Sequence, residues 1–147
     1  MRIRDWKSER GNALVEFAIV LPIFLFIVWA VVDFGRAFYT ANSLAAAVRE
    51  GARFAAVKDW PPTATAAQAQ INSDSVKMRV KNAFNAFGGV PIDTAKVVVT
   101  QPGANGQITV EDTAYTWTTS TPLSVITGAT IKMRKKAVFR WELQPTT

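Results

Sequence analysis

The pattern of apolar and polar positions separates one long apolar run near the start from shorter, alternating segments after it. From Phe17 to Val32 no residue carries a charge, and extending the run back to Leu14 adds only Glu16. About 20 apolar residues, at about 1.5 Å per residue in a helix, span the roughly 30 Å hydrocarbon core of a bilayer. The pattern therefore predicts one transmembrane helix over residues 12–33.

Helical periodicity continues beyond this run. Small and apolar residues recur at three- and four-residue spacing up to about Val57. Gly51 among them either admits the close approach of a neighbouring element, which the surrounding alanines favour, or is simply a weak spot in the helix. Pro22 removes one helical hydrogen bond inside the apolar run, so it is either a kink of no consequence or a soft point in the helix. The Pro-Pro pair at 61–62 ends the pattern.

A second helix and a sheet are predicted for the remainder. Thr63 or Thr65 is a suitable N-cap for a helix that runs to about Phe87, where Gly88 and Gly89 end it. Beyond it the apolar period becomes two, and the Asn-Gly pair at 105–106 indicates a hairpin. The predicted strands are residues 96–101, 107–110, 114–119 and 130–143. The expected fold class is α+β: a long N-terminal helix, transmembrane in its first half, and a second helix packed on a small antiparallel sheet of three or four strands.

The last predicted strand has an apolar and a basic face. Its odd positions are Ile131, Met133, Ala137, Phe139, Trp141 and Leu143, interrupted by Lys135, and its even positions are Lys132, Arg134, Lys136, Val138, Arg140 and Glu142. One face should be buried and the other solvated. Solvation and edge protection explain a basic face in most proteins, and an anionic partner, such as an acidic subunit, a surface polysaccharide or DNA, is the alternative.

Charges that flank the apolar run predict its orientation. Four basic residues lie within Met1–Arg10, whereas Asp33 and Arg36 after the run largely cancel. Flanks rich in Lys and Arg stay in the cytoplasm. We therefore expect residues 1–11 to form an unstructured cytoplasmic leader, and residues 34–147 to form a domain on the periplasmic or extracellular side of a bacterial inner membrane.

Three interpretations of the apolar run remain open. A removable secretory signal has a shorter apolar region that ends in small residues, and the alanines at 45–47 lie too far beyond the run. A permanent anchor requires nothing beyond the run itself. The third interpretation is a processed helix, and it rests on Gly11 and Glu16.

Glu16 is costly in an apolar helix, by about 2.5–3.5 kcal/mol at the centre and less near an end. It either snorkels to the interface or has a partner. A cut after Gly11, whose backbone a protease can approach closely, creates an α-amino group at Asn12. That amine on a neighbouring chain is a candidate partner for Glu16.

Three motifs stand out in the first 57 residues: RGNALVEFAIVLP at 10–22, DFGR at 33–36 and AVREGARFAAV at 47–57. Together they resemble the TadE-like family of minor pilins, or pseudopilins, of tight-adherence (Flp) type IV pilus systems. The first motif is similar to the processing site of type IV prepilins. The resemblance implies cleavage after Gly11 by an aspartyl prepilin peptidase, a retained apolar helix, and partners among other pilin subunits and the pilus assembly machinery. Asn12, directly after the cut, is a polar residue for which no reason is evident from this pattern.

Composition narrows the function classes. The 147 residues include 17 basic and 11 acidic ones, for a net charge of +6, and four of the basic and two of the acidic residues precede Asn12. Much of the basicity is therefore a topology signal rather than a nucleic-acid footprint. Without Cys or His, the chain has no disulfides, no His-based triad and no His or Cys metal cluster.

We therefore expect a structural, pilin-like subunit that supports pilus biogenesis, adhesion and surface attachment. No cofactor, metal, small-molecule substrate or nucleic-acid partner is expected. One rival is a permanently membrane-anchored periplasmic binding or adaptor module that uses the basic face of the last strand. An enzyme is the other, but the carboxylates are scattered: Asp59, Asp74, Asp93, Glu111, Asp112 and Glu142.

Overall fold

The computed structural model describes residues 6–61, 64–87, 91–102, 105–119, 121, 128 and 130–141. The chain forms two compact units, Met1–Arg36 with Thr118–Ala129 and Ala37–Trp117 with Thr130–Thr147. We call them the first and the second unit and describe each by itself. Predictions for Thr63, for Gly88 and Gly89 as a helix end, and for Glu142 and Leu143 lie outside the described residues.

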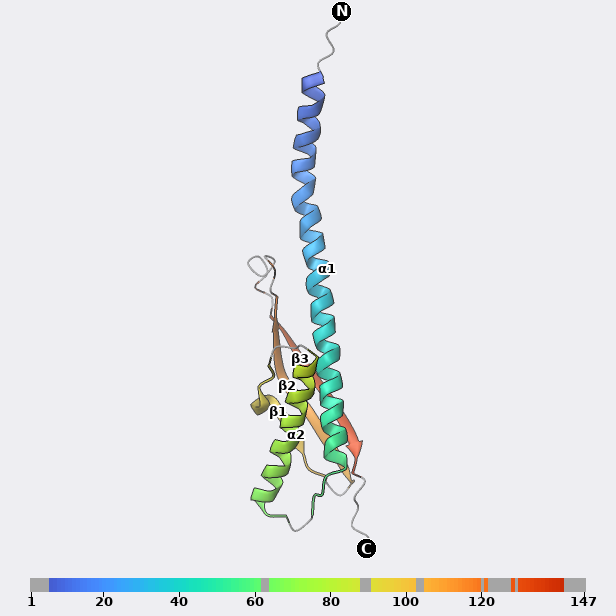
Figure 1. Cartoon of the computed structure of the whole chain (residues 1–147), viewed down its shortest axis with the longest axis vertical. Coiled ribbons are helices and arrows are strands. Elements are labelled where there is room, and N and C mark those ends of the chain that lie inside the picture. The colour runs from blue at the N-terminus through green and yellow to red at the C-terminus, as the bar shows by residue number, and fades with distance from the viewer. Residues whose placement is uncertain are drawn as a thin grey trace, which may run out of the picture. The chain divides into compact units, whose positions relative to one another are not determined.

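Helix α1 is the longest element and contributes to both units. It runs without interruption over Trp6–Ala56 and ends before Pro61, as predicted (Figure 1). The expectation of an unstructured leader is wrong for Trp6–Arg10, which is helical. Lys, Glu and Arg in this segment are good helix formers, and adding turns to an existing helix is far easier than nucleating one.

Helix α2 spans Ala66–Ala86 and begins at the predicted cap. Thr65 is extended, and its side-chain oxygen accepts a hydrogen bond from the backbone N–H of Gln68 at 3.3 Å. Val80 and Phe84 on its apolar face are fully buried. The cap and the buried face confirm the predicted second helix.

The three strands form one antiparallel sheet in the order β1-β2-β3. A 3₁₀ turn, η1 (Thr94–Lys96), leads into β1 (Val97–Thr100), which is followed by β2 (Gln107–Thr118) and β3 (Thr130–Arg140). Val97 of β1 lies opposite Asp112 of β2, and Thr100 lies opposite Thr109. Two helices and a three-stranded sheet confirm the α+β fold class.

Strand β2 corrects the prediction of two separate strands over residues 107–110 and 114–119. Its buried positions are Ile108, Val110 and Asp112 in the first half, then Tyr115 and Trp117 in the second, so the alternation slips by one residue. At the slip, Asp112 Oδ1 accepts hydrogen bonds from the backbone N–H groups of Ala114 and Tyr115, both at 2.9 Å. Side-chain-to-backbone bonds of this kind replace ladder bonds, so a single strand changes face in the manner of a bulge.

The core of the second unit lies where α1, α2 and the sheet meet. Leu44 and Val48 of α1 are fully buried, as is Ile108 of β2. A Cβ at Gly51 would lie 2.2 Å from Cγ2 of Val80. The predicted close approach at Gly51 is therefore confirmed, and α2 is the element that approaches.

The end of β3 is tied to two other segments of the second unit. Trp141 is buried, and its indole Nε1–H donates to the carbonyl of Lys58 at 2.9 Å. The backbone N–H of Trp141 donates to the carbonyl of Gly106 in the β1–β2 turn at 2.7 Å. Ile131 and Phe139, predicted for the buried face of this strand, are instead 44% and 38% exposed, since they lie near its two ends.

Candidate functional site

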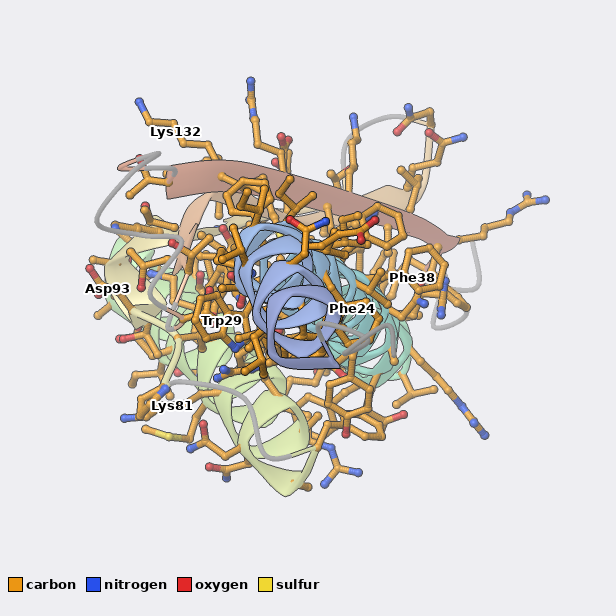
Figure 2. The ribbon with its side chains drawn as sticks, turned by 90° about the horizontal axis from the view of Figure 1, so that it is seen from above. Phe24, Trp29, Phe38, Lys81, Asp93 and Lys132 are labelled. Carbon is orange, nitrogen blue, oxygen red and sulfur yellow. The ribbon has the colours of Figure 1, made fainter. Side chains whose placement is uncertain are left out.

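The apolar half of α1 is the candidate site, and it belongs to the first unit. Every residue from 11 to 29 is exposed, and large apolar side chains project from all sides of the helix. Phe24 and Trp29 both point outward from the helix axis (Figure 2). A helix that is apolar all round requires lipid or other helices as its surroundings. The length and composition of α1 fit a single-pass membrane anchor.

Gly11 and Asn12 lie inside α1 and are exposed. A Cβ at Gly11 would meet nothing within 4 Å, and Gly11 does not adopt a positive φ. The fold therefore requires glycine at this position neither for space nor for backbone conformation. Gly51 in the same helix differs, because Val80 occupies the space that a side chain at position 51 would need.

Glu16 lies four residues after Asn12, one turn along the same face of α1. Its side chain is exposed, and no ion pair involves it within the described part of the chain. The structure thus brings Asn12 and Glu16 together on one face. It leaves the carboxylate accessible to a group outside this chain.

Pro22 lies six residues beyond Glu16, on a different side of the helix. The helix continues through it, although proline has no N–H to donate to the carbonyl of Ala18. In a membrane, such a carbonyl is satisfied by a neighbouring group or by a local adjustment of the backbone. Pro22 is therefore the position along the apolar half where the helix has lost one of its own hydrogen bonds.

Asp33 ends the apolar half with a buried carboxylate. It is 4% exposed, and its Oδ2 accepts a hydrogen bond from the hydroxyl of Thr121 in the same unit. Its Oδ1 is buried without a hydrogen-bond partner among the described residues. In the sequence pattern Asp33 is only a flanking charge, because a contact with a residue 88 positions away leaves no local signal.

Among the described residues of the second unit, Asp112 has a buried carboxylate as well. Burial raises its pKa, opposed by the N–H groups of Ala114 and Tyr115 and by the charge of Lys96. Asp112 and Asp93 line a cavity of about 110 Å³, but no three Asp or Glu side chains gather to hold a metal among the described residues. Its hydrogen bonds to the β2 backbone make Asp112 a structural residue of the strand.

All four predicted site residues, Gly11, Asn12, Glu16 and Pro22, thus fall on one exposed apolar segment. Residues 11–53 match the family model of TadE-like proteins. The match confirms the resemblance that the three N-terminal motifs predict, and the TadE-like segment contains Gly11, Glu16, Pro22 and Gly51. No curated protein and no solved structure matches the chain.

Proposed function

We propose that this chain is a minor pilin-like subunit of a Flp, or tight-adherence, type IV pilus. It is made as a single-pass protein of the bacterial inner membrane, cut after Gly11, and assembled through its apolar helix. One observation supports this most directly: an exposed glycine that the fold does not need precedes, by five positions, an exposed carboxylate in an apolar helix. Such a glycine suits an external protein that must approach the backbone.

The proposed cut hydrolyses the peptide bond between Gly11 and Asn12. Water supplies one oxygen of the new Gly11 carboxylate, and both of its protons pass to the new amine at Asn12. Because both residues are helical in the uncut chain, the peptidase must first open this turn of α1. The Lys- and Arg-containing leader stays on the cytoplasmic side, which places residues 34–147 on the periplasmic side or, in an assembled pilus, outside the cell.

The cut also gives Asn12 a structural role. In the middle of a helix, asparagine is a weak helix former, whereas at a helix start it is among the preferred capping residues. Cleavage moves Asn12 from the first of these positions to the second. Glu16 then lies in the second turn of the helix, close to its new start.

Assembly places Glu16 beside the new amine of a neighbouring subunit. The new amine at Asn12 of the same chain lies about 6 Å from Glu16 along the helix axis, four residues at about 1.5 Å each. The amines of the two chains therefore compete for the Glu16 carboxylate. The apolar surface on all sides of the helix adds the packing that selects the neighbour over solvent. We propose that prepilin peptidase, other pilin subunits and the assembly machinery are the partners, that the pilus mediates adhesion and surface attachment, and that the chain is not an enzyme.

The deciding experiment is the N-terminal mass of the chain isolated from its native cell, in membrane and pilus fractions. The proposal expects a chain that starts at Asn12. Gly11→Leu should block cutting and leave the longer form in the membrane. Gly35→Leu is the matched control, because Gly35 lies in the same helix, is exposed, and also has nothing within 4 Å of a Cβ. Retention of residues 1–11 in every fraction contradicts the proposal and favours a permanent anchor.

Glu16→Ala separates cutting from assembly. The variant should still be cut after Gly11, but its share in the pilus fraction should fall, because the neighbour's amine loses its carboxylate. Immunoblots of sheared pili and of membranes measure that share. Unchanged incorporation shows that Glu16 has no part in assembly.

A further inference from the structure

The outer face of the sheet, on the side away from the helices, carries a row of cations. Met133 and Ala137 of β3 are buried on the helix side, and Lys132 points away from the helices (Figure 2). The exposed residues that alternate with them are Lys132, Arg134, Lys136, Val138 and Arg140. Because every second residue of a strand faces the same way, Lys132, Arg134 and Lys136 follow one another at about 6.7 Å along the strand, and Arg140 follows after Val138.

The neighbouring strands extend this outer face. Val98 and Thr100 of β1 lie opposite Glu111 and Thr109 of β2, and opposed residues of an antiparallel pair share a face. Glu111 already accepts a hydrogen bond from Arg134 at 3.2 Å. Within the described strands, the outer face therefore presents one carboxylate, which is paired, and threonine hydroxyls beside the cation row.

Most of the described acids of the second unit are paired or buried, and the remaining two, Asp59 and Asp93, are exposed single carboxylates far apart along the chain. Glu50 pairs with Arg79 at 2.7 Å, and Asp74 pairs with Lys77 at 3.4 Å. Asp112 is fully buried. With a net charge of +6, two copies also repel each other, so the charge on this face fits a partner of a different kind.

We propose that the outer face of the sheet binds a linear acidic polysaccharide. A straight row of cations matches a chain with repeated carboxylates, and the threonine hydroxyls beside it can bond to sugar hydroxyls. Single-stranded nucleic acid is bound on aromatic platforms, and no aromatic side chain lies on this face of the described strands. The major groove of double-helical DNA is read by a helix or a narrow two-stranded ribbon, rather than by the flat face of a sheet.

Polysaccharide binding adds a surface activity to the proposed subunit and does not depend on cleavage at Gly11. Each exposed cation contributes weakly in water, so binding needs several simultaneous contacts and falls as salt increases. Polysaccharide binding belongs to the second unit, whereas the proposed assembly role belongs to the apolar half of α1 in the first unit. The two activities can therefore be tested separately.

The test measures binding of the full-length chain in detergent to immobilised alginate, a polyuronate, at low and at physiological salt. The variant K132Q/K136Q removes two cations from the row. The control K77Q/K81Q removes two cations from α2, so both variants have the same net charge. We expect about tenfold or more weaker binding and a smaller salt dependence for K132Q/K136Q, and less than about twofold weaker binding for the control.

Thermal unfolding of both variants verifies that the fold is intact. Equal losses in the two variants would show that net charge alone attracts the polymer and overturn the proposal. Unchanged binding by K132Q/K136Q would assign the row to solvation and edge protection. Tighter binding to polyglutamate or to double-stranded DNA of equal charge would overturn it in favour of an acidic protein or a nucleic acid.

Discussion

The two halves of α1 use one helix in opposite ways. Up to Val32 the helix carries large apolar side chains that are exposed on every side. From Ala37 onward its buried positions are mostly alanine, with Leu44 and Val48 among them, and one stripe faces the core. Large exposed residues suit a surface that meets lipid or many partners, whereas small buried ones suit a fixed fit to one neighbour. Side-chain size along a single helix therefore separates the part made for association from the part made for folding.

The largest effect expected from this comparison is at Leu44. It is fully buried, so Leu44→Ala should lower the free energy of unfolding of the second unit by about 2–5 kcal/mol. Leu25 is 38% exposed, and Leu25→Ala should change that free energy by less than about 0.5 kcal/mol. Denaturant unfolding of the full-length chain in detergent, followed by tryptophan fluorescence, measures both. Similar losses for the two variants would remove the distinction between the halves.

The two glycines Gly51 and Gly35 provide a smaller effect. Gly51→Ala places a Cβ into Val80 and should destabilise the second unit by about 1–3 kcal/mol. Gly35→Ala meets open space and should leave the stability unchanged or slightly raise it. Adding Val80→Ala to Gly51→Ala should recover part of the first loss, because the clash is with the Val80 methyl group. If the double variant loses as much free energy of unfolding as the two single variants together, the contact between Gly51 and Val80 does not carry the effect.

The buried carboxylate of Asp112 in the second unit and the exposed carboxylate of Glu16 in the first unit give the smallest expected effect. The folded pKa of Asp112 is raised above its ordinary value of 3.8, so the folded state holds its proton to higher pH than the unfolded state. Stability should therefore fall as pH rises from about 3.8 through the folded pKa, and level off above it. Asp112→Asn keeps the oxygen that accepts the N–H groups of Ala114 and Tyr115, and should flatten this dependence.

Glu16→Gln is the control for this pH experiment. Glu16 lies in the first unit and is exposed, so the variant should leave the pH dependence of second-unit unfolding as it is. The measurement is the denaturation midpoint as pH rises from just below the ordinary pKa of 3.8 until the midpoint levels off. An unchanged slope in Asp112→Asn would show that another group carries the dependence.

Local patterns predicted the helices well, because their determinants are local. Thr65 caps α2 by bonding three residues along the chain, and the Pro-Pro pair marks the end of the first helical pattern. The close approach at Gly51 was also predictable, since a glycine costs helix stability and its alanine neighbours already indicate tight packing. Its partner, Val80, was not, because nothing local indicates which element fills the space.

The strands were predicted less well where a side chain acts on the backbone. Glu111, Asp112 and Thr113 interrupt the β pattern, so two strands with a break between them were predicted there. In the structure, Asp112 turns that break into a change of face within β2. The bond between Asp33 and Thr121 was missed for a different reason, since it joins residues far apart along the chain. The predicted site residues of α1 all fell on the expected exposed segment, and whether the chain is cut there remains a prediction.

The position of Trp141 has a practical consequence for work on this protein. One residue at the end of β3 fastens that strand both to the segment after α1 and to the β1–β2 turn, through the carbonyls of Lys58 and Gly106. A truncation that removes it would release three stretches of chain at once. Reporter proteins and affinity handles therefore belong downstream of Trp141, and shortened versions should retain it.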